Sequence, residues 1–136
     1  MPMCMKTPCY CAAIRSAARK TTALYDEALA PAGVNLAQYS LLRKIDRAGT
    51  VSLTELGRLA ELDRSTVGRN VKVLERLRLV RVASAEDHRE AAVRLAPAGA
   101  ETLRRAAPFW EEAQRSVETI LGAGGAEQMR TLALRL

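Results

Sequence analysis

Apolar residues recur every three or four positions through most of the chain, which is the spacing of one face of an α-helix. In the first such segment, Thr7 and Pro8 predict a helix start, and APAG at residues 30–33 predicts its end. The apolar positions between these signals are Ile14, Ala17, Thr21, Leu24 and Ala28. The chain therefore begins with one long helix, predicted over residues 9–30.

Three shorter helices follow, each with its own start signal. Asn35 can cap a helix that ends near Gly49, because Asn is favoured before a helix and Gly after it. Ser52 and Glu55 match the S-x-x-E capping box before the second, and Asp63 can cap the third. The predicted buried faces comprise Leu36, Tyr39, Leu42 and Ile45, then Leu53, Leu56 and Ala60, then Val67, Val71, Leu74 and Leu77.

Beyond the third short helix, the pattern changes to strict alternation. Val80 and Val82, and later Val93 and Leu95, alternate with arginines, which is the period of half-buried strands. We therefore predict a β-hairpin over residues 80–95, with the charged run EDHRE in its loop.

The C-terminal part of the chain returns to helical spacing. A long helix starts at Pro97, and GAGG at residues 122–125 separates it from a short final helix. Their apolar positions are Leu103, Ala106, Trp110, Ala113, Val117 and Leu121, then Met129, Leu132 and Leu136.

Two short helices followed directly by a two-stranded hairpin are the elements of a winged helix-turn-helix. We place it at residues 35–95, and 136 residues suffice for one winged-helix domain over 1–136. The predicted fold class is mainly α (α+β). The long helices on either side, 9–30 and 98–136, lie outside the winged part.

The overall charge of +6 favours polyanionic partners, because Lys and Arg that neutralise phosphates release condensed counterions. Charged residues break every apolar stretch well short of the roughly 20 residues that a membrane crossing requires. The N-terminal sequence also lacks the continuous apolar block of a signal peptide. We expect a cytoplasmic protein without a membrane partner.

The third short helix carries a polar and cationic side opposite its apolar stripe. A helix fits the major groove of B-DNA, and its N-terminal residues reach base edges. The DNA-binding residues predicted on this helix are Arg64, Ser65, Thr66, Arg69, Asn70 and Lys72. Ser65, Thr66 and Arg69 are assigned to base edges. Arg64 and Lys72 are assigned to phosphates.

The hairpin loop is then the wing tip of a DNA-binding domain. Arg89 is the side chain best placed to enter the adjacent minor groove, where A·T-rich sequence concentrates negative potential. His88 lies beside it, and Asp87, two residues before Arg89, can orient the guanidinium. The alternative is that these charges are simply solvated.

Three stretches of the sequence resemble the MarR family of bacterial transcription regulators: LAQYSLLRKI, LTELGRLAELDRSTVGRNVKVLERLRLV and DHREAAVRLAPAG. The family's wing motif is D-x-R, a strand, then L-T-x-x-G, which is matched by Asp87, Arg89, Leu95 and Gly99. Ala96 stands where the family usually has Thr. A side-chain cap is therefore missing, and Pro97 alone starts the next helix.

The resemblance implies a homodimer, without a cofactor, whose terminal helices interlock and place two recognition helices on a pseudopalindromic double-stranded operator. The predicted dimerisation helices are 9–30 and 98–136, since they carry more apolar surface than one winged domain covers. This surface includes Leu24, Trp110, Val117 and Leu132. The predicted function is a sequence-specific regulator, a repressor that a small molecule or an oxidative signal releases.

The three cysteines, Cys4, Cys9 and Cys11, lie in the first eleven residues. Helix N-termini favour the thiolate form of cysteine, so Cys9 and Cys11 are candidate redox-sensing residues. CAAIRSAARKTTALY is similar to the family's organic-hydroperoxide sensors, in which the reactive cysteine precedes a tyrosine by fourteen residues. Cys11 and Tyr25 match this spacing, although they can meet only across a dimer.

Two positions depart from the hydroperoxide-sensing pattern, because Arg15 and Leu36 stand where that subgroup often carries tyrosines. The alternatives are that Cys9 and Cys11 pack in a dimer interface, or that the three thiols bind a soft metal in a metal-responsive regulator. A phenolic or aromatic-acid effector in the cleft beside the dimer helices is a further possibility.

Other classes of function fit the residues less well. An enzyme is not expected, since His88, the only histidine, lies in an exposed loop and no Gly-rich phosphate loop or HExxH pattern is present. A winged protein-interaction module that does not bind DNA is the main alternative. The cationic side of the third short helix argues against it.

Overall fold

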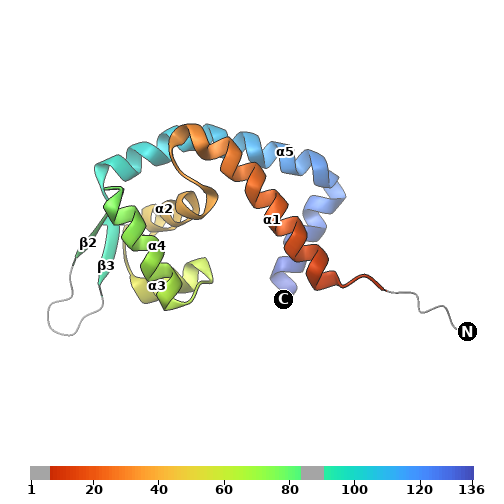
Figure 1. The fold of residues 1–136 in the computed structure, drawn as a ribbon, viewed down its shortest axis with the longest axis horizontal. Coiled ribbons are helices and arrows are strands. Elements are labelled where there is room, and N and C mark those ends of the chain that lie inside the picture. The colour runs from red at the N-terminus through yellow and green to blue at the C-terminus, as the bar shows by residue number, and fades with distance from the viewer. Residues whose placement is uncertain (1–6, 84–90) are drawn as a thin grey trace, which may run out of the picture.

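The computed structural model describes residues 7–83 and 91–136. Its elements in chain order are α1 (Tyr10–Leu29), a 3-10 turn η1 (Ala30–Ala32), α2 (Leu36–Ala48), β1 (Thr50–Ser52), α3 (Leu53–Ala60), α4 (Arg64–Arg76), β2 (Val80–Ala83), β3 (Ala92–Leu95) and α5 (Pro97–Arg135). The predicted mainly α winged helix-turn-helix with long terminal helices is confirmed. Helices α1 and α5 lie side by side and extend away from the winged part (Figure 1).

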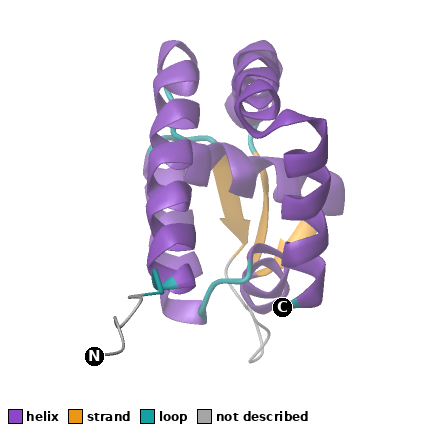
Figure 2. Cartoon of the chain, turned by 90° about the vertical axis from the view of Figure 1, so that its right-hand side faces the viewer, coloured by secondary structure: helices purple, strands orange, loops and turns teal. Residues whose placement is uncertain are grey.

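The sheet has three antiparallel strands in the order β1-β3-β2, where two strands were predicted. The predicted hairpin strands pair as expected, with Val80 opposite Leu95 and Arg81 opposite Arg94. The additional strand, β1, pairs Val51 with Val93. Sequence periodicity missed β1 because three residues are too few to show alternation. The strands lie between helices in the view of Figure 2.

The predicted caps of α2 and α3 differ in how completely they form. The Asn35 side chain accepts a hydrogen bond from the Gln38 amide at 2.9 Å, and the Gln38 side chain accepts one from the Asn35 amide at 3.0 Å. Ser52 Oγ likewise accepts from the Glu55 amide at 3.1 Å. The Glu55 carboxylate, however, accepts from Arg58 Nε at 2.9 Å, so the predicted S-x-x-E capping box forms only its first half.

Two helix boundaries differ from the sequence prediction. Helix α1 begins at Tyr10 with Cys9 as its N-cap, and the Cys9 side chain makes no capping hydrogen bond, so the predicted start at Thr7 and Pro8 was wrong. Leu77 was predicted to be buried, but it follows the end of α4 and is half exposed. The chain turns there because Arg78 adopts a left-handed conformation, with φ of 61°.

The hydrophobic core belongs to the winged part and to the helix segments that contact it. Its largest fully buried side chains are Leu29, Leu42, Ile45, Leu56, Leu74, Val67 and Val93. Trp110 packs at the edge of this core, and the Arg43 guanidinium lies 4.4 Å from its ring centroid. Trp110, predicted to contribute uncovered apolar surface, is therefore partly covered by its own chain.

Helix α5 bends sharply where the GAGG sequence predicted a separation. Gly122 has φ of 73° and ψ of 166°, which no helical residue adopts, and helix continues on both sides of it. Figure 1 shows the segment after this bend turning back toward α1. Within residues 7–83 and 91–136, no helix is long and apolar enough to span a membrane.

The start of α5 packs against the turn that follows α4. A Cβ atom built on Gly99 would lie 2.0 Å from the Leu79 carbonyl oxygen, far inside van der Waals contact. The same carbonyl accepts a hydrogen bond from the Ala96 amide at 3.0 Å. Ala96 provides no side-chain cap, and Pro97 occupies the first turn, as predicted. Glycine at position 99 therefore permits the close approach of α5 to the wing.

Substitution of Gly99 by Ala is expected to lower the free energy of unfolding by at least about 2 kcal/mol, because backbone must move to admit the methyl group. The matched control is Gly68→Ala in α4, where an added Cβ meets nothing within 4 Å. That change is expected to raise the free energy by roughly 0.5–1 kcal/mol through helix propensity. Urea denaturation at one protein concentration measures both. Equal stability of Gly99→Ala and wild type would contradict the close packing.

Candidate nucleic-acid interface

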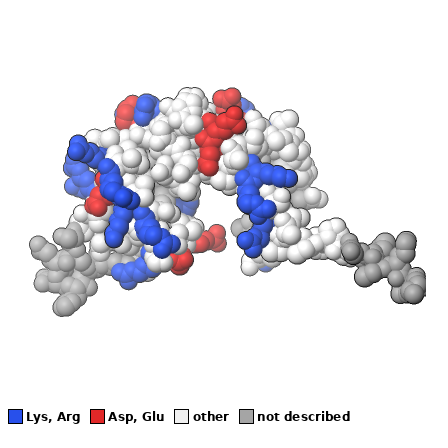
Figure 3. Space-filling view, viewed as in Figure 1, with Lys and Arg blue, Asp and Glu red and all other residues white. Residues whose placement is uncertain are grey.

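Helix α4 turns one side into the core and the other to solvent. Val67, Val71 and Leu74 are almost completely buried and recur at the spacing of one helix face. The opposite face is exposed and carries Ser65, Arg69, Lys72 and Arg76. Because the buried stripe fixes the rotation of the helix about its axis, this cationic stripe must face outward. Figure 3 shows basic side chains gathered over α4.

The six residues predicted on α4 occupy two kinds of position. Arg64, Ser65, Arg69 and Lys72 are exposed, whereas Thr66 and Asn70 are half-buried at the border of the apolar stripe. Arg76 extends the exposed stripe by one turn, and sequence reasoning missed it. Its signal was present, since Arg76 follows Lys72 by four residues on the same face.

Asp63 organises the first turn of α4 through three hydrogen bonds. Its Oδ1 accepts from the Thr66 amide and from Ser65 Oγ, both at 2.8 Å, and its Oδ2 accepts from Thr66 Oγ1 at 3.0 Å. Arg69 Nη2 in turn donates to Thr66 Oγ1 at 3.3 Å. The Thr66 amide, followed by the two hydroxyls, holds the pKa of Asp63 below its ordinary value of 3.8. Sequence reasoning identified Asp63 only as a cap.

A tight turn sets the position of α4 relative to α3. The Leu62 amide donates to the Gly57 carbonyl oxygen at 2.9 Å, and Glu61 adopts a left-handed conformation, with φ of 54°. A Cβ on Gly57 would lie 3.0 Å from the Leu62 carbonyl oxygen. This close contact holds the two helices of the helix-turn-helix at a defined angle.

Strand β2 follows α4 closely in the chain and packs against it, and β3 pairs with β2. Arg81 and Arg94 are paired across the two strands, and both are exposed. The predicted wing-tip residues, Asp87, His88 and Arg89, lie outside the described residues. Their assignment to DNA contact therefore stays a prediction.

The thiols of Cys9 and Cys11 are free and exposed at the start of α1. Together with Ala12, Arg15 and Arg19 they line an open hollow of about 320 Å³. Arg15, four residues after Cys11, thus borders the same hollow as the two thiols. Cys4 lies outside the described residues. Among the residues that the structure describes, no group of three or more His, Cys, Asp or Glu side chains is arranged to hold a metal ion.

Tyr25, the other candidate redox residue, lies near the opposite end of α1 from the thiols. It is buried against α5, and its hydroxyl donates a hydrogen bond to Gln114 Oε1. Burial, followed by the negative charge of Glu118, raises the pKa of Tyr25. Fourteen helical residues separate it from Cys11, about 21 Å along the axis, so the two do not meet within one protomer.

Comparison with known proteins relates both the helix-turn-helix and the whole fold to other regulators. The MarR family model matches residues 32–90. The structure of the M. tuberculosis transcriptional regulator MosR in complex with DNA is 31% identical in sequence, covers 94% of this chain and 92% of that chain, and has a TM-score of 0.85. A search of curated protein sequences found no significant match.

Two further solved structures extend the comparison. A probable transcriptional regulator from Pseudomonas aeruginosa is 26% identical, with 90% of this chain and 92% of that chain covered and a TM-score of 0.80. A mutant of E. coli MarR complexed with operator DNA is 21% identical, with 91% and 90% covered and a TM-score of 0.82, and shares the fold. The family model together with the likeness to MosR shows that this chain belongs to the MarR family of transcription regulators.

Proposed function

We propose that the chain is a sequence-specific double-stranded DNA-binding transcriptional regulator whose helix α4 enters the major groove. The observation that carries the proposal is the exposed stripe of α4, which combines hydroxyl and cationic side chains directly opposite a buried apolar stripe. The solved complexes of MosR with DNA and of E. coli MarR with operator DNA support it.

The individual roles follow from position on the helix. Ser65, Thr66 and Arg69 lie in the first two turns and are assigned to base edges, because the N-terminal part of a recognition helix enters the groove most deeply. Arg64 and Lys72 are assigned to phosphates, and Arg76 joins them from the exposed stripe. Asn70 borders the same face. In the wing, we assign Arg89 to the minor groove, with His88 and Asp87 beside it.

Substitution of Arg69 by Ala is expected to weaken binding to a selected operator at least about tenfold, because a good base contact contributes roughly 1–3 kcal/mol. Arg89→Ala is expected to weaken it as well. For the wild type, the logarithm of the association constant should fall linearly with the logarithm of the salt concentration, since phosphate contacts release counterions. Fluorescence anisotropy with a labelled duplex measures both effects.

The matched control is Arg104→Ala, which removes an exposed arginine of α5 that pairs with Glu101 in the same helix. This variant is expected to bind DNA like the wild type. Binding that is insensitive to salt, or an Arg69→Ala variant with unchanged affinity and specificity, would instead favour a protein-interaction module.

A homodimer is the second part of the proposal. The terminal helices leave large apolar side chains exposed, and these are Tyr10, Ile14, Leu24, Ile120, Leu121, Met129, Leu134 and Leu136. One protomer does not cover them, whereas a second copy can. With a two-fold axis, the two α4 helices would address successive major grooves of a pseudopalindromic site, about 34 Å apart.

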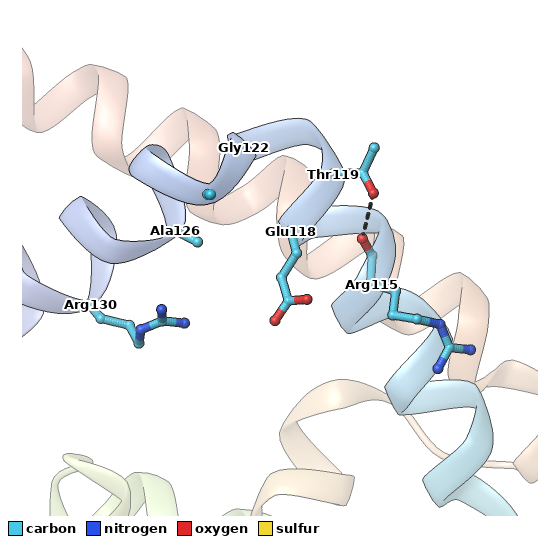
Figure 4. Close-up of a pocket in the computed structure, with 7 residues that line it drawn as sticks. Arg115, Glu118, Thr119, Gly122, Ala126 and Arg130 are labelled. Carbon is cyan, nitrogen blue, oxygen red and sulfur yellow. Dashed lines mark hydrogen bonds between the residues drawn. The ribbon is translucent and has the colours of Figure 1, made fainter.

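The bend of α5 adds a docking groove to this apolar surface. A hollow of about 610 Å³ lies at the bend and is lined by Arg115, Glu118, Thr119, Gly122, Ala123, Ala126 and Arg130. Figure 4 shows the Glu118 carboxylate and the Arg130 guanidinium reaching into the space that the two arms of α5 enclose. A second copy entering here would meet charged groups at the edge of an apolar face, as protein interfaces commonly provide.

Substitution of Ile120, which is 71% exposed, by Glu is expected to dissociate the dimer, because the second copy would have to bury a carboxylate. Leu77→Glu is the control, since Leu77 is also exposed but lies at the end of α4. Sedimentation velocity should find two copies for the wild type and the control, and one for Ile120→Glu. A wild type that sediments as one copy would refute the dimer.

Release by oxidation is the third part of the proposal. The thiols of Cys9 and Cys11 are accessible, and Arg15 and Arg19 line the same hollow. A Cys11 thiolate can attack the terminal oxygen of an organic hydroperoxide, which forms an S–O bond and breaks the O–O bond. The sulfenic acid stays on Cys11, and the departing alkoxide takes a proton from water to become the alcohol. A polar, bulkier group would then stand on the terminal helix proposed for dimerisation. The regulator is thereby proposed to be a repressor that oxidation releases.

Treatment with cumene hydroperoxide is expected to release the wild type from its selected operator and to leave Cys11→Ser bound. Cys9→Ser shows whether the neighbouring thiol contributes. Electrophoretic mobility shift measures binding, and mass spectrometry of the intact protein follows oxygen addition. Equal release of wild type and Cys11→Ser would contradict sensing by Cys11 and would favour a small-molecule effector or cysteines that only pack in the interface.

A further inference from the structure

We propose that Asp63 acts as a positioning residue that makes the hydroxyls of Ser65 and Thr66 hydrogen-bond acceptors toward DNA. The first turn of α4 then recognises a base that offers an amino group in the major groove, adenine through N6 or cytosine through N4, on the strand it contacts. This inference rests on the proposed function, because it assumes that α4 enters the major groove. It adds the chemical class of base that the hydroxyls select.

Each of the two hydroxyls carries a single hydrogen. An ionised carboxylate only accepts hydrogen bonds, so a hydroxyl that contacts it must donate. Ser65 Oγ lies 2.8 Å from Asp63 Oδ1, and Thr66 Oγ1 lies 3.0 Å from Asp63 Oδ2. Both hydroxyl hydrogens are therefore directed at Asp63. What remains on the two oxygens is lone pairs.

Arg69 further limits the hydrogen bonds that the Thr66 hydroxyl can make. Its Nη2 donates to Thr66 Oγ1 at 3.3 Å, which occupies one lone pair and leaves one. Thr66 can then accept one more hydrogen bond and donate none. Ser65, which is exposed, keeps both lone pairs for an incoming donor.

Free serine and threonine hydroxyls bind either donors or acceptors, so they discriminate poorly between bases. Guanine N7 and O6, thymine O4 and phosphate oxygens all accept hydrogen bonds, and none can bond to a hydroxyl oxygen that has no hydrogen to offer. Amino groups can. Asp63 therefore converts two ambiguous side chains into acceptors and excludes keto bases and phosphates as their partners.

A capping function alone does not account for the geometry. A helix N-cap needs one accepted amide bond, which Asp63 Oδ1 makes with the Thr66 amide at 2.8 Å. The second oxygen, Oδ2, accepts from the Thr66 hydroxyl instead of from an amide of the helix. Asn caps a helix as well as Asp does, but it has a donor in place of Oδ2. Asp63→Asn therefore keeps the cap and forces the Thr66 hydroxyl to accept from the side chain, freeing its hydrogen.

The test is selection from random-sequence double-stranded DNA with the full chain and its Asp63→Asn, Asp63→Ser and Thr66→Val variants. Asp63→Ser has a single oxygen and cannot hold both hydroxyls, so it serves as a second variant should Asp63→Asn fold poorly. For the wild type we expect adenine or cytosine on one strand at the position under the first turn. Asp63→Asn and Asp63→Ser should admit guanine or thymine there, and Thr66→Val should weaken the preference, because Ser65 alone remains as an acceptor.

A base analogue makes the result quantitative. Replacing the selected adenine by 2-aminopurine, or the selected cytosine by 2-pyrimidinone, removes the major-groove amino group. We expect the wild type to lose about tenfold in affinity and Thr66→Val, in which only Ser65 accepts, to lose distinctly less. Thr50→Val, which removes an exposed hydroxyl of β1, is the control and should behave like the wild type.

The outcomes separate the inference from the proposed function. If the wild type selects a sequence whose base preferences are unchanged in every Asp63 and Thr66 variant, or selects a keto base at this position, the inference fails while the function stands. A uniform loss of affinity without altered preference assigns Asp63 to capping alone and likewise overturns it. A wild type that selects no sequence at all overturns the proposed function and this inference with it.

Discussion

The burial of one stripe of α4 is the interaction on which the candidate interface depends. Val67, Val71 and Leu74 are nearly inaccessible, and each contributes roughly 1.5–3 kcal/mol by leaving water. Their burial does more than stabilise the helix, because it fixes the helix about its own axis. The stripe that carries Arg69 and Lys72 then has no alternative but to face solvent.

Backbone packing around α4 also fixes the position of this helix relative to α3, the wing and α5. The turn between Gly57 and Leu62 sets the angle to α3, and the approach of Gly99 to the Leu79 carbonyl joins the wing to the start of α5. Both contacts are made by glycines with almost no free space. The helix, the base of the wing and the start of the long terminal helix therefore form one closely packed unit.

The terminal helices have a different physical character from the winged part. They pack against each other, yet they leave several large apolar side chains exposed to water, among them Tyr10 in α1 and Ile120 in α5. The thiols lie at the start of α1, the end of that helix that points away from the winged part (Figure 1). In the proposed regulator, a chemical change at Cys11 therefore acts on α4 indirectly, by changing how the two protomers of the dimer are positioned relative to each other.

What the sequence alone determined is local. Asn35, Ser52 and Asp63 each cap the helix that follows, because a cap bonds to an amide only three residues away. The alternation at Val80 and Val93 predicted the paired strands, and the spacing along α4 predicted which of its sides is buried. Family resemblance added the identity of the fold.

The three-dimensional structure decided what the spacing of residues leaves open. Strand β1 exists because β3 pairs with it, Leu77 is exposed because the chain turns at Arg78, and Trp110 is partly covered because Arg43 stacks on it. Glu55 turned to Arg58, leaving its capping box half formed. The use of both oxygens of Asp63 also required three-dimensional geometry, since the spacing of residues does not say where a hydroxyl hydrogen points. The periodicity of the sequence predicts which side of a helix or strand is apolar, whereas the residues which that side contacts are determined by tertiary packing.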